Sequence, residues 1–142
     1  MTKEEACSLL AFLGIRTGMT LSLRNIPLEF QEKLLPLLEG VHVLEVCKTG
    51  VDMTLFFAES QKELVKHLPE LSRRMSVNGK IWVFFHIDMA IEGGLSEDFV
   101  RLTALHVGLT DDRYCPQVLG WLGLRLRWRP RSKRLEKPSF CC

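Results

Sequence analysis

The residues of this chain that could perform acid–base chemistry lie where hydrophobic runs end. His86 lies near the end of the run "KIWVFFHI" (80–87), and Asp88 comes two positions later. A histidine oriented by a carboxylate can act as a general base, so His86 and Asp88 are the candidate catalytic pair. A partly buried structural histidine is the alternative interpretation of His86.

Acidic side chains near two other predicted strand ends are candidates for ligand binding. Glu45 lies near the end of the run 41–46, where an acid can hold the ribose hydroxyls of a nucleotide. It can also simply mark an exposed strand edge. Glu59 follows the run 51–58 directly, but Ser60 beside it, with Glu63 three residues later, predicts a helix cap here.

The stretch "MTLSLRNIPLEF" (19–30) predicts a strand that turns directly into a helix. At such a turn, sites for dinucleotides or S-adenosylmethionine usually have glycines, because only a backbone without side chains approaches the ligand closely. This turn has no glycine, and Pro27 removes one of the amides that would face an anion. The turn therefore argues against a usual dinucleotide or S-adenosylmethionine site. Arg24, Asn25 and Pro27 are still ligand-binding candidates, and a solvated loop is the preferred interpretation of these residues.

The histidines and cysteines lack the spacing of a metal site or a disulfide framework. The four histidines form no pair with metal-ligand spacing, and the five cysteines include no C-x-x-C motif. We therefore expect no metal ion and reduced thiols. Cys141 and Cys142 resemble the end of prenylated small GTPases, but the chain has no G-x-x-x-x-G-K-[ST] loop, so chance or a redox-sensitive tail is preferred.

The spacing of apolar residues predicts the elements that position these side chains. Helices are predicted over 3–13, 27–40 with an early bend at Pro36, 60–75 and 96–108. Strands are predicted over 19–24, 41–46, 51–58 and 80–87, with a turn at 77–80 and a terminal hairpin within 113–128. This order predicts an α/β fold, a three-layer sandwich with a mostly parallel sheet that ends in an antiparallel hairpin.

Three segments carry a resemblance to a known family: "LGIRTGMTLSLRNIPLEF", "VDMTLFFAESQKELVKHLPEL" with "NGKIWVFF", and "EDFVRLTALHVGLTDDRYCPQVLGWLGLRLRWR". Over about residues 8–129 the chain resembles a small bacterial family of Rossmann-like proteins of unknown function, and more broadly a truncated class I methyltransferase. The resemblance implies a Rossmann-like, methyltransferase-like fold and no particular activity. Where that family has a proline-lysine pair after the middle strand, this chain has Phe85 and His86.

The composition is that of an ordinary globular domain. Of the 142 residues, 46% are hydrophobic and 25% are charged, and the apolar runs are far below the ~20 residues that cross a bilayer. We therefore predict a cytoplasmic protein without a membrane partner. We assign residues 1–129 to a single domain and residues 130–142 to a basic, disordered tail.

Charge is distributed unevenly between the two parts of the chain. The residues from Arg125 onward include seven basic side chains and one acid, whereas the first 124 residues carry 12 basic and 16 acidic side chains. Such a basic segment can meet nucleic acid without reading its sequence. The side chains that would do so are Arg125, Arg127, Arg129, Arg131, Lys133 and Arg134. A half-buried outer strand followed by a solvated tail is the alternative.

Three functions from different classes remain open at this point. The leading interpretation is a non-enzymatic Rossmann-like domain that binds a protein or small-molecule partner, with no cofactor. The first alternative is a diverged S-adenosylmethionine-dependent enzyme using Arg24, Asn25, Glu45 and His86. The second is a nucleic-acid accessory protein that uses the basic tail. The terminal hairpin also leaves a strand edge through which a homodimer could form.

Overall fold

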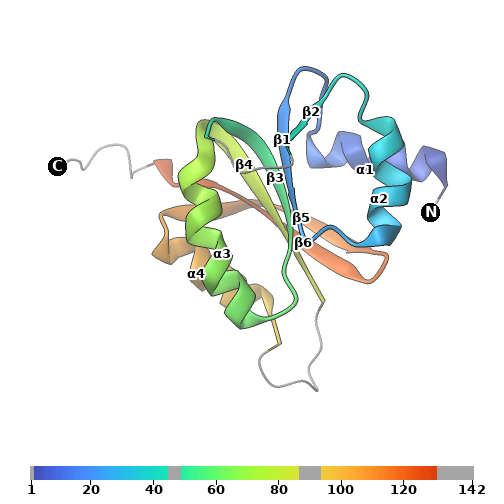
Figure 1. The fold of residues 1–142 in the computed structure, drawn as a ribbon. Helices are drawn as coiled ribbons and strands as arrows, with labels where there is room; N and C mark the ends of the chain where they lie inside the picture. The colour runs from blue at the N-terminus through green and yellow to red at the C-terminus, as the bar shows by residue number, and fades with distance from the viewer. Residues whose placement is uncertain (1, 45–48, 87–93, 131–142) are drawn as a thin grey trace.

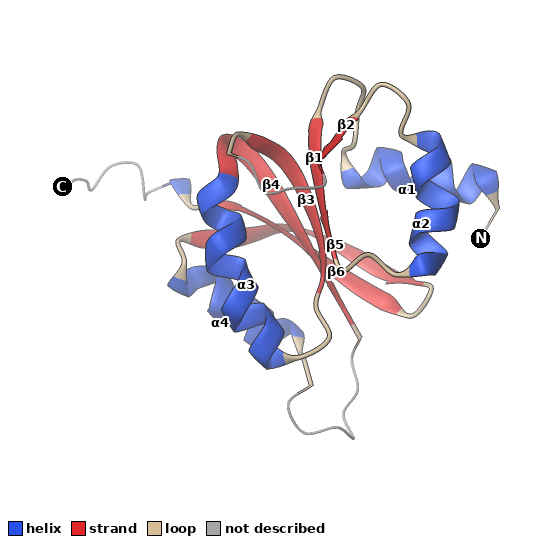
Figure 2. Ribbon diagram, viewed as in Figure 1, coloured by secondary structure: helices blue, strands red, loops and turns tan. Residues whose placement is uncertain are grey.

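The computed structural model describes residues 2–44, 49–86 and 94–130, which form one six-stranded sheet with helices on both faces (Figure 1). The helical elements are α1 (Lys3–Leu13), α2 (Leu28–Leu34), η1 (Leu35–Leu37), α3 (Gln61–Arg74) and α4 (Glu97–His106). The strands are β1 (Thr20–Arg24), β2 (His42–Leu44), β3 (Val51–Phe57), β4 (Met75–Phe85), β5 (Leu109–Val118) and β6 (Trp121–Trp128). Helices α1 and α2 cover one face and α3 and α4 the other, which confirms the three-layer α/β class (Figure 2).

The sheet has the strand order β2-β1-β3-β4-β6-β5. Strands β2, β1, β3 and β4 pair in parallel, whereas β6 pairs antiparallel with both β4 and β5. The prediction of a mostly parallel sheet that ends in a C-terminal hairpin is therefore confirmed. Because β2 and β3 lie on opposite sides of β1, the strand order reverses at β1, which is the place where α/β sheets open a crevice.

Both faces of the central strands are buried, as the unbroken apolar run of β4 predicts. Trp82 and Phe84 face α1 and α2, while Ile81, Val83 and Phe85 face α3 and α4, and none of the five is more than 1% exposed. Neighbouring residues of a strand point to opposite faces, so residues 81–85, which are covered on both faces, are all apolar.

Short polar signals begin and end the helices. The hydroxyl of Ser60 accepts a hydrogen bond from the Glu63 amide at 3.1 Å, which confirms the predicted cap. Pro27 is the N-cap of α2, so the helix begins at Leu28, one residue later than predicted. Helix α2 ends at Leu34, two residues before Pro36. No helix within the described residues is long and apolar enough to cross a membrane.

The prediction of a turn at residues 77–80 is wrong. Helix α3 runs directly into β4, whose first residue Met75 pairs with Val51, while Lys80 pairs with Met53. Between these two pairs, β4 has three more residues than β3. It accommodates the extra residues as a bulge. At Gly79 a Cβ atom would lie 2.8 Å from the carbonyl oxygen of Val51, so glycine permits this close approach.

Candidate functional site

Three parallel strands bring most of the described candidate residues to one edge of the sheet. Asn25 and Pro27 follow β1, Glu59 follows β3 after one residue, and His86 follows β4. The strands end in step, because Arg24 pairs with Phe56 and Phe57 pairs with Phe84. This carboxyl edge, between β1 and β3, is where the strand order reverses.

Asn25 has a left-handed backbone conformation. The sequence did not predict it, because the turn contains no glycine. The φ of Asn25 is +59°, in the left-handed region that favours glycine, although asparagine tolerates it better than most residues. After it the chain is held by the Gln31 side chain, which donates to the carbonyl oxygen of Ile26 at 3.1 Å, and by Pro27 in extended conformation. Asparagine therefore takes the role that glycine has in other sharp turns after a first strand. Its place between a strand and a helix was the signal available in the sequence.

Arg24 points away from this edge, to the α3 face of the sheet. Its guanidinium group donates to Nδ1 of His67 at 3.0 Å and lies 3.5 Å from a carboxylate oxygen of Glu70. The Arg24 side chain is 19% exposed. The structure therefore separates Arg24, which contacts α3, from Asn25, with which the sequence grouped it.

His86 is oriented by the hairpin rather than by a carboxylate of the described residues. Its Nδ1 lies 2.6 Å from the carbonyl oxygen of Gly120, and its ring lies 3.9 Å from the ring of Trp121, centroid to centroid. A carbonyl can only accept, so Nδ1 carries the hydrogen and Nε2 of the neutral ring is left as a proton acceptor. His86 is exposed at the edge, whereas the alternative interpretation expected a partly buried histidine. Asp88 lies outside the described residues.

Glu59 keeps an exposed side chain next to the N-terminus of α3. Its backbone amide donates to the Glu63 carboxylate at 3.0 Å, while its own carboxylate has no partner within residues 2–44, 49–86 and 94–130. Ser60, rather than Glu59, supplies the cap of α3. Glu45 lies outside the described residues, so its contact with a ribose stays a prediction.

The arginines of β6 are largely engaged within the hairpin. Arg125 makes two hydrogen bonds to the Asp112 carboxylate, at 2.8 and 3.2 Å, and Arg127 lies 3.4 Å from the same group. One face of β6 carries these arginines, and Leu124 and Leu126 are buried on the other, as the alternation predicts. The prediction that this strand is an outer one is wrong, because β6 lies between β4 and β5. Arg131, Lys133 and Arg134 lie outside the described residues, so nucleic-acid binding stays a prediction.

The described cysteines differ strongly in their surroundings. Cys7 is exposed on α1, whereas Cys115 is buried in β5 and its Sγ donates to the carbonyl oxygen of Pro116. Burial raises the pKa of the Cys115 thiol to about 11. In the part of the chain that the structure describes, no three histidine, cysteine or acidic side chains gather as metal ligands do.

We expect iodoacetamide at pH 8 to alkylate Cys7 and to leave Cys115 unmodified in the folded protein. Only the thiolate reacts, and both burial and the raised pKa, about 11, suppress it at Cys115. Because that pKa exceeds the ordinary value of 9.0, the thiol's contribution to stability is complete below pH 9 and is lost as the pH rises through 11. Mass spectrometry of the separated peptides measures each site. Equal labelling of both cysteines would contradict the buried position.

Comparison with known proteins identifies a fold but no family. No family model matches the chain, and no curated protein matches it in sequence. Among solved structures, the mitomycin 7-O-methyltransferase MmcR superposes with a TM-score of 0.63 at 14% identity, over 89% of this chain and 54% of that one. The chain thus spans about half the length of that enzyme.

Two smaller proteins share the same fold over most of their length. A SAM-dependent methyltransferase from Aquifex aeolicus matches with a TM-score of 0.59 at 14% identity, over 86% of this chain and 88% of that one. The magnesium protoporphyrin IX methyltransferase ChlM from Synechocystis PCC 6803, solved with bound SAM, gives 0.56 at 12% identity, over 87% and 78%. The predicted resemblance to a methyltransferase-like, Rossmann-like fold is confirmed.

Proposed function

We propose that this chain binds an S-adenosyl compound at the carboxyl edge of its sheet. The fold neighbours favour this alternative over a non-enzymatic domain without a cofactor, which was the leading interpretation of the sequence. The observation that carries the proposal is the left-handed backbone of Asn25, φ +59°, at the point where the strand order reverses. A strained backbone held at such a place is typical of ligand-binding turns.

The described residues around this turn supply complementary groups for such a ligand. The left-handed turn at Asn25 lets the backbone approach a ligand closely, and Glu59 offers an exposed carboxylate after the neighbouring strand. Glu45, which follows β2 by one position, is the acid proposed for the ribose hydroxyls. Phe30 of α2 and Phe57 of β3 are both buried, and their rings pack together near this edge.

Titration calorimetry with S-adenosylmethionine and S-adenosylhomocysteine tests the proposal. We expect Asn25→Gly to keep the affinity of the native chain and Asn25→Val to weaken it roughly 5- to 30-fold, since a β-branched residue pays about 1–2 kcal/mol for a left-handed backbone. Gly18→Val is the matched control, because Gly18 has a φ of +87° at the opposite edge of the sheet and open space around it. It should lose stability but retain affinity. No binding by the native chain at saturating concentrations of either compound would contradict the proposal.

Methyl transfer is the second candidate function, favoured by the orientation of His86. The hydrogen bond from Nδ1 to the carbonyl of Gly120 fixes the tautomer of His86. In this tautomer Nε2 can take a proton from the molecule that accepts the methyl group. Transfer of a labelled methyl group from S-adenosylmethionine, lost in His86→Gln while the affinity for S-adenosylmethionine is unchanged, would distinguish transfer from binding alone.

A further inference from the structure

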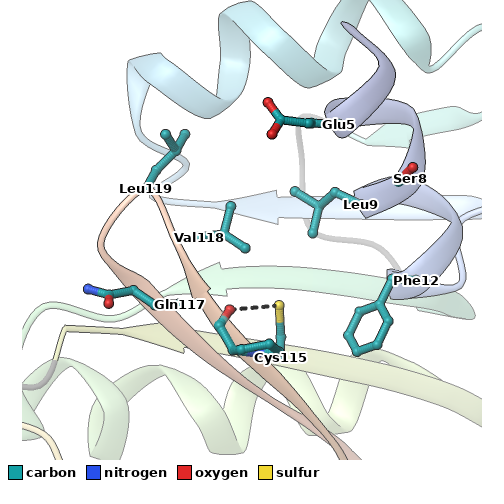
Figure 3. A pocket seen from close by; sticks show the side chains of 9 residues that line it. Glu5, Ser8, Leu9, Phe12, Cys115, Gln117, Val118 and Leu119 are labelled. Atoms are coloured by element: carbon teal, nitrogen blue, oxygen red, sulfur yellow. Dashed lines mark hydrogen bonds between the residues drawn. The ribbon is translucent and has the colours of Figure 1, made fainter. Parts of the chain in front are cut away.

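A hollow lies between helix α1 and strand β5 (Figure 3). Its volume is about 610 Å³, within the range of ~300–1,000 Å³ that is usual for small-molecule sites. None of Asn25, Pro27, Glu59 and His86 lines it. We call it the α1–β5 pocket, with Leu9 and Phe12 on the helix wall and Cys115, Val118 and Leu119 on the hairpin wall.

The inner surface of the α1–β5 pocket is apolar and partly open to water. Leu9 and Val118 project into the space between the helix and the hairpin (Figure 3). Phe12 and Leu119, which also line it, are 37% and 36% exposed. Large apolar side chains left accessible around a concave surface are typical of a binding site, because a bound molecule would remove them from water.

Both walls are fixed by contacts that do not involve a ligand. Arg113 donates to the carbonyl oxygen of Phe12 at 3.1 Å, and its guanidinium carbon lies 5.2 Å from the centre of the Phe12 ring. On the other wall, Leu119 and Gly120 both have positive φ, +50° and +88°, in the two-residue turn between β5 and β6. The pocket is therefore preformed, and little ordering is needed to fill it.

One carboxylate lies at the rim of the pocket. Glu5 is the one ionisable acid that lines the pocket, the other polar lining residues include Ser8 and Gln117, and no described lysine or arginine lines it. The amide of Thr2 donates to the Glu5 carboxylate at 2.7 Å. This hydrogen bond from the Thr2 backbone lowers the pKa of Glu5, so the carboxylate stays ionised at neutral pH.

We propose that the α1–β5 pocket binds a small, largely apolar molecule that carries a protonated amine. The apolar body lies between Leu9 and Val118, and the amine meets the Glu5 carboxylate at the rim. The volume selects a small molecule, and the single negative charge selects a cation. No residue that lines this pocket belongs to the proposed adenosyl site.

Three indole compounds of nearly equal size test the proposal by titration calorimetry: tryptamine, the neutral 3-ethylindole and the anionic indole-3-propionate. Tryptamine should bind best and indole-3-propionate worst. Glu5→Gln should weaken tryptamine binding about two- to fivefold, as expected of an exposed ion pair, and leave 3-ethylindole unchanged. The glutamine keeps the capping interaction with Thr2. Glu4→Gln is the matched control, because Glu4 lies in the same helical turn but does not line the pocket.

Filling the pocket from either wall tests its position. Ser8→Trp from the helix and Gln117→Trp from the hairpin replace exposed side chains, so each variant should keep the thermal midpoint and lose tryptamine binding at least tenfold. Their affinity for S-adenosylhomocysteine should equal that of the native chain, which separates this site from the edge site. Unchanged tryptamine binding in both folded variants would contradict the proposed position of the site. Equal binding of all three indoles would contradict the proposed contact between the amine and Glu5.

Discussion

Replacing Phe57 by alanine should lower the free energy of unfolding by about 3–5 kcal/mol, as expected for an aromatic side chain removed from a core. Phe57 is fully buried at the end of β3. Its ring is stacked on that of Phe84 at 4.8 Å and lies 4.9 Å from the ring of Phe30 and 5.2 Å from that of Trp121. Its loss would leave a cavity among side chains of β4, α2 and β6, which relax only partly into it.

Urea denaturation followed by circular dichroism measures this loss. Val77→Ala is the control, since Val77 is 78% exposed in the bulge of β4 and its replacement should change the free energy of unfolding by no more than about 0.5 kcal/mol. The cavity also lies beneath the edge where Asn25 turns, so Phe57→Ala should weaken binding of S-adenosylhomocysteine. If Phe57→Ala lowered the free energy of unfolding by less than about 1 kcal/mol, packing of Phe57 against β4, α2 and β6 would not stabilise the fold as expected.

The sequence predicted the sheet well because burial determines the patterns that it contains. The run "IWVFF" of β4 is apolar at every position, since both faces of this strand are covered. Alternation in β6 shows in the same way that Leu124 and Leu126 face the core and that Arg125 does not. Such periods follow from local geometry, so a single sequence suffices to recognise them.

The parts of the site that depend on direction or on distant contacts could not be predicted. Arg24 and Asn25 are neighbours in the sequence, yet Arg24 binds residues of α3 and only Asn25 remains at the edge. The α1–β5 pocket depends on Arg113 reaching the carbonyl of Phe12, a contact between residues 101 positions apart. Neither the direction of a side chain at a strand end nor a contact of this range leaves a periodic pattern in the sequence.

Trp82→Ala should also cost about 3–5 kcal/mol of unfolding free energy, and here a hydrogen bond contributes together with packing. Trp82 is fully buried in β4, and its Nε1 donates to the carbonyl oxygen of Leu13 at 2.9 Å. Leu13 is the last residue of α1, whose final carbonyls have no partner within the helix. The indole therefore fastens the end of α1 to the sheet.

Trp82→Phe separates the two contributions, because it keeps most of the ring and leaves the Leu13 carbonyl without its donor. We expect a loss of about 1–3 kcal/mol in urea denaturation. Trp121→Phe removes the same indole N–H where the described residues provide it no hydrogen bond, so it should cost less. Since α1 forms one wall of the α1–β5 pocket, Trp82→Phe should also weaken tryptamine binding. Equal losses of stability in the two variants would show that the bond to Leu13 does not hold the helix.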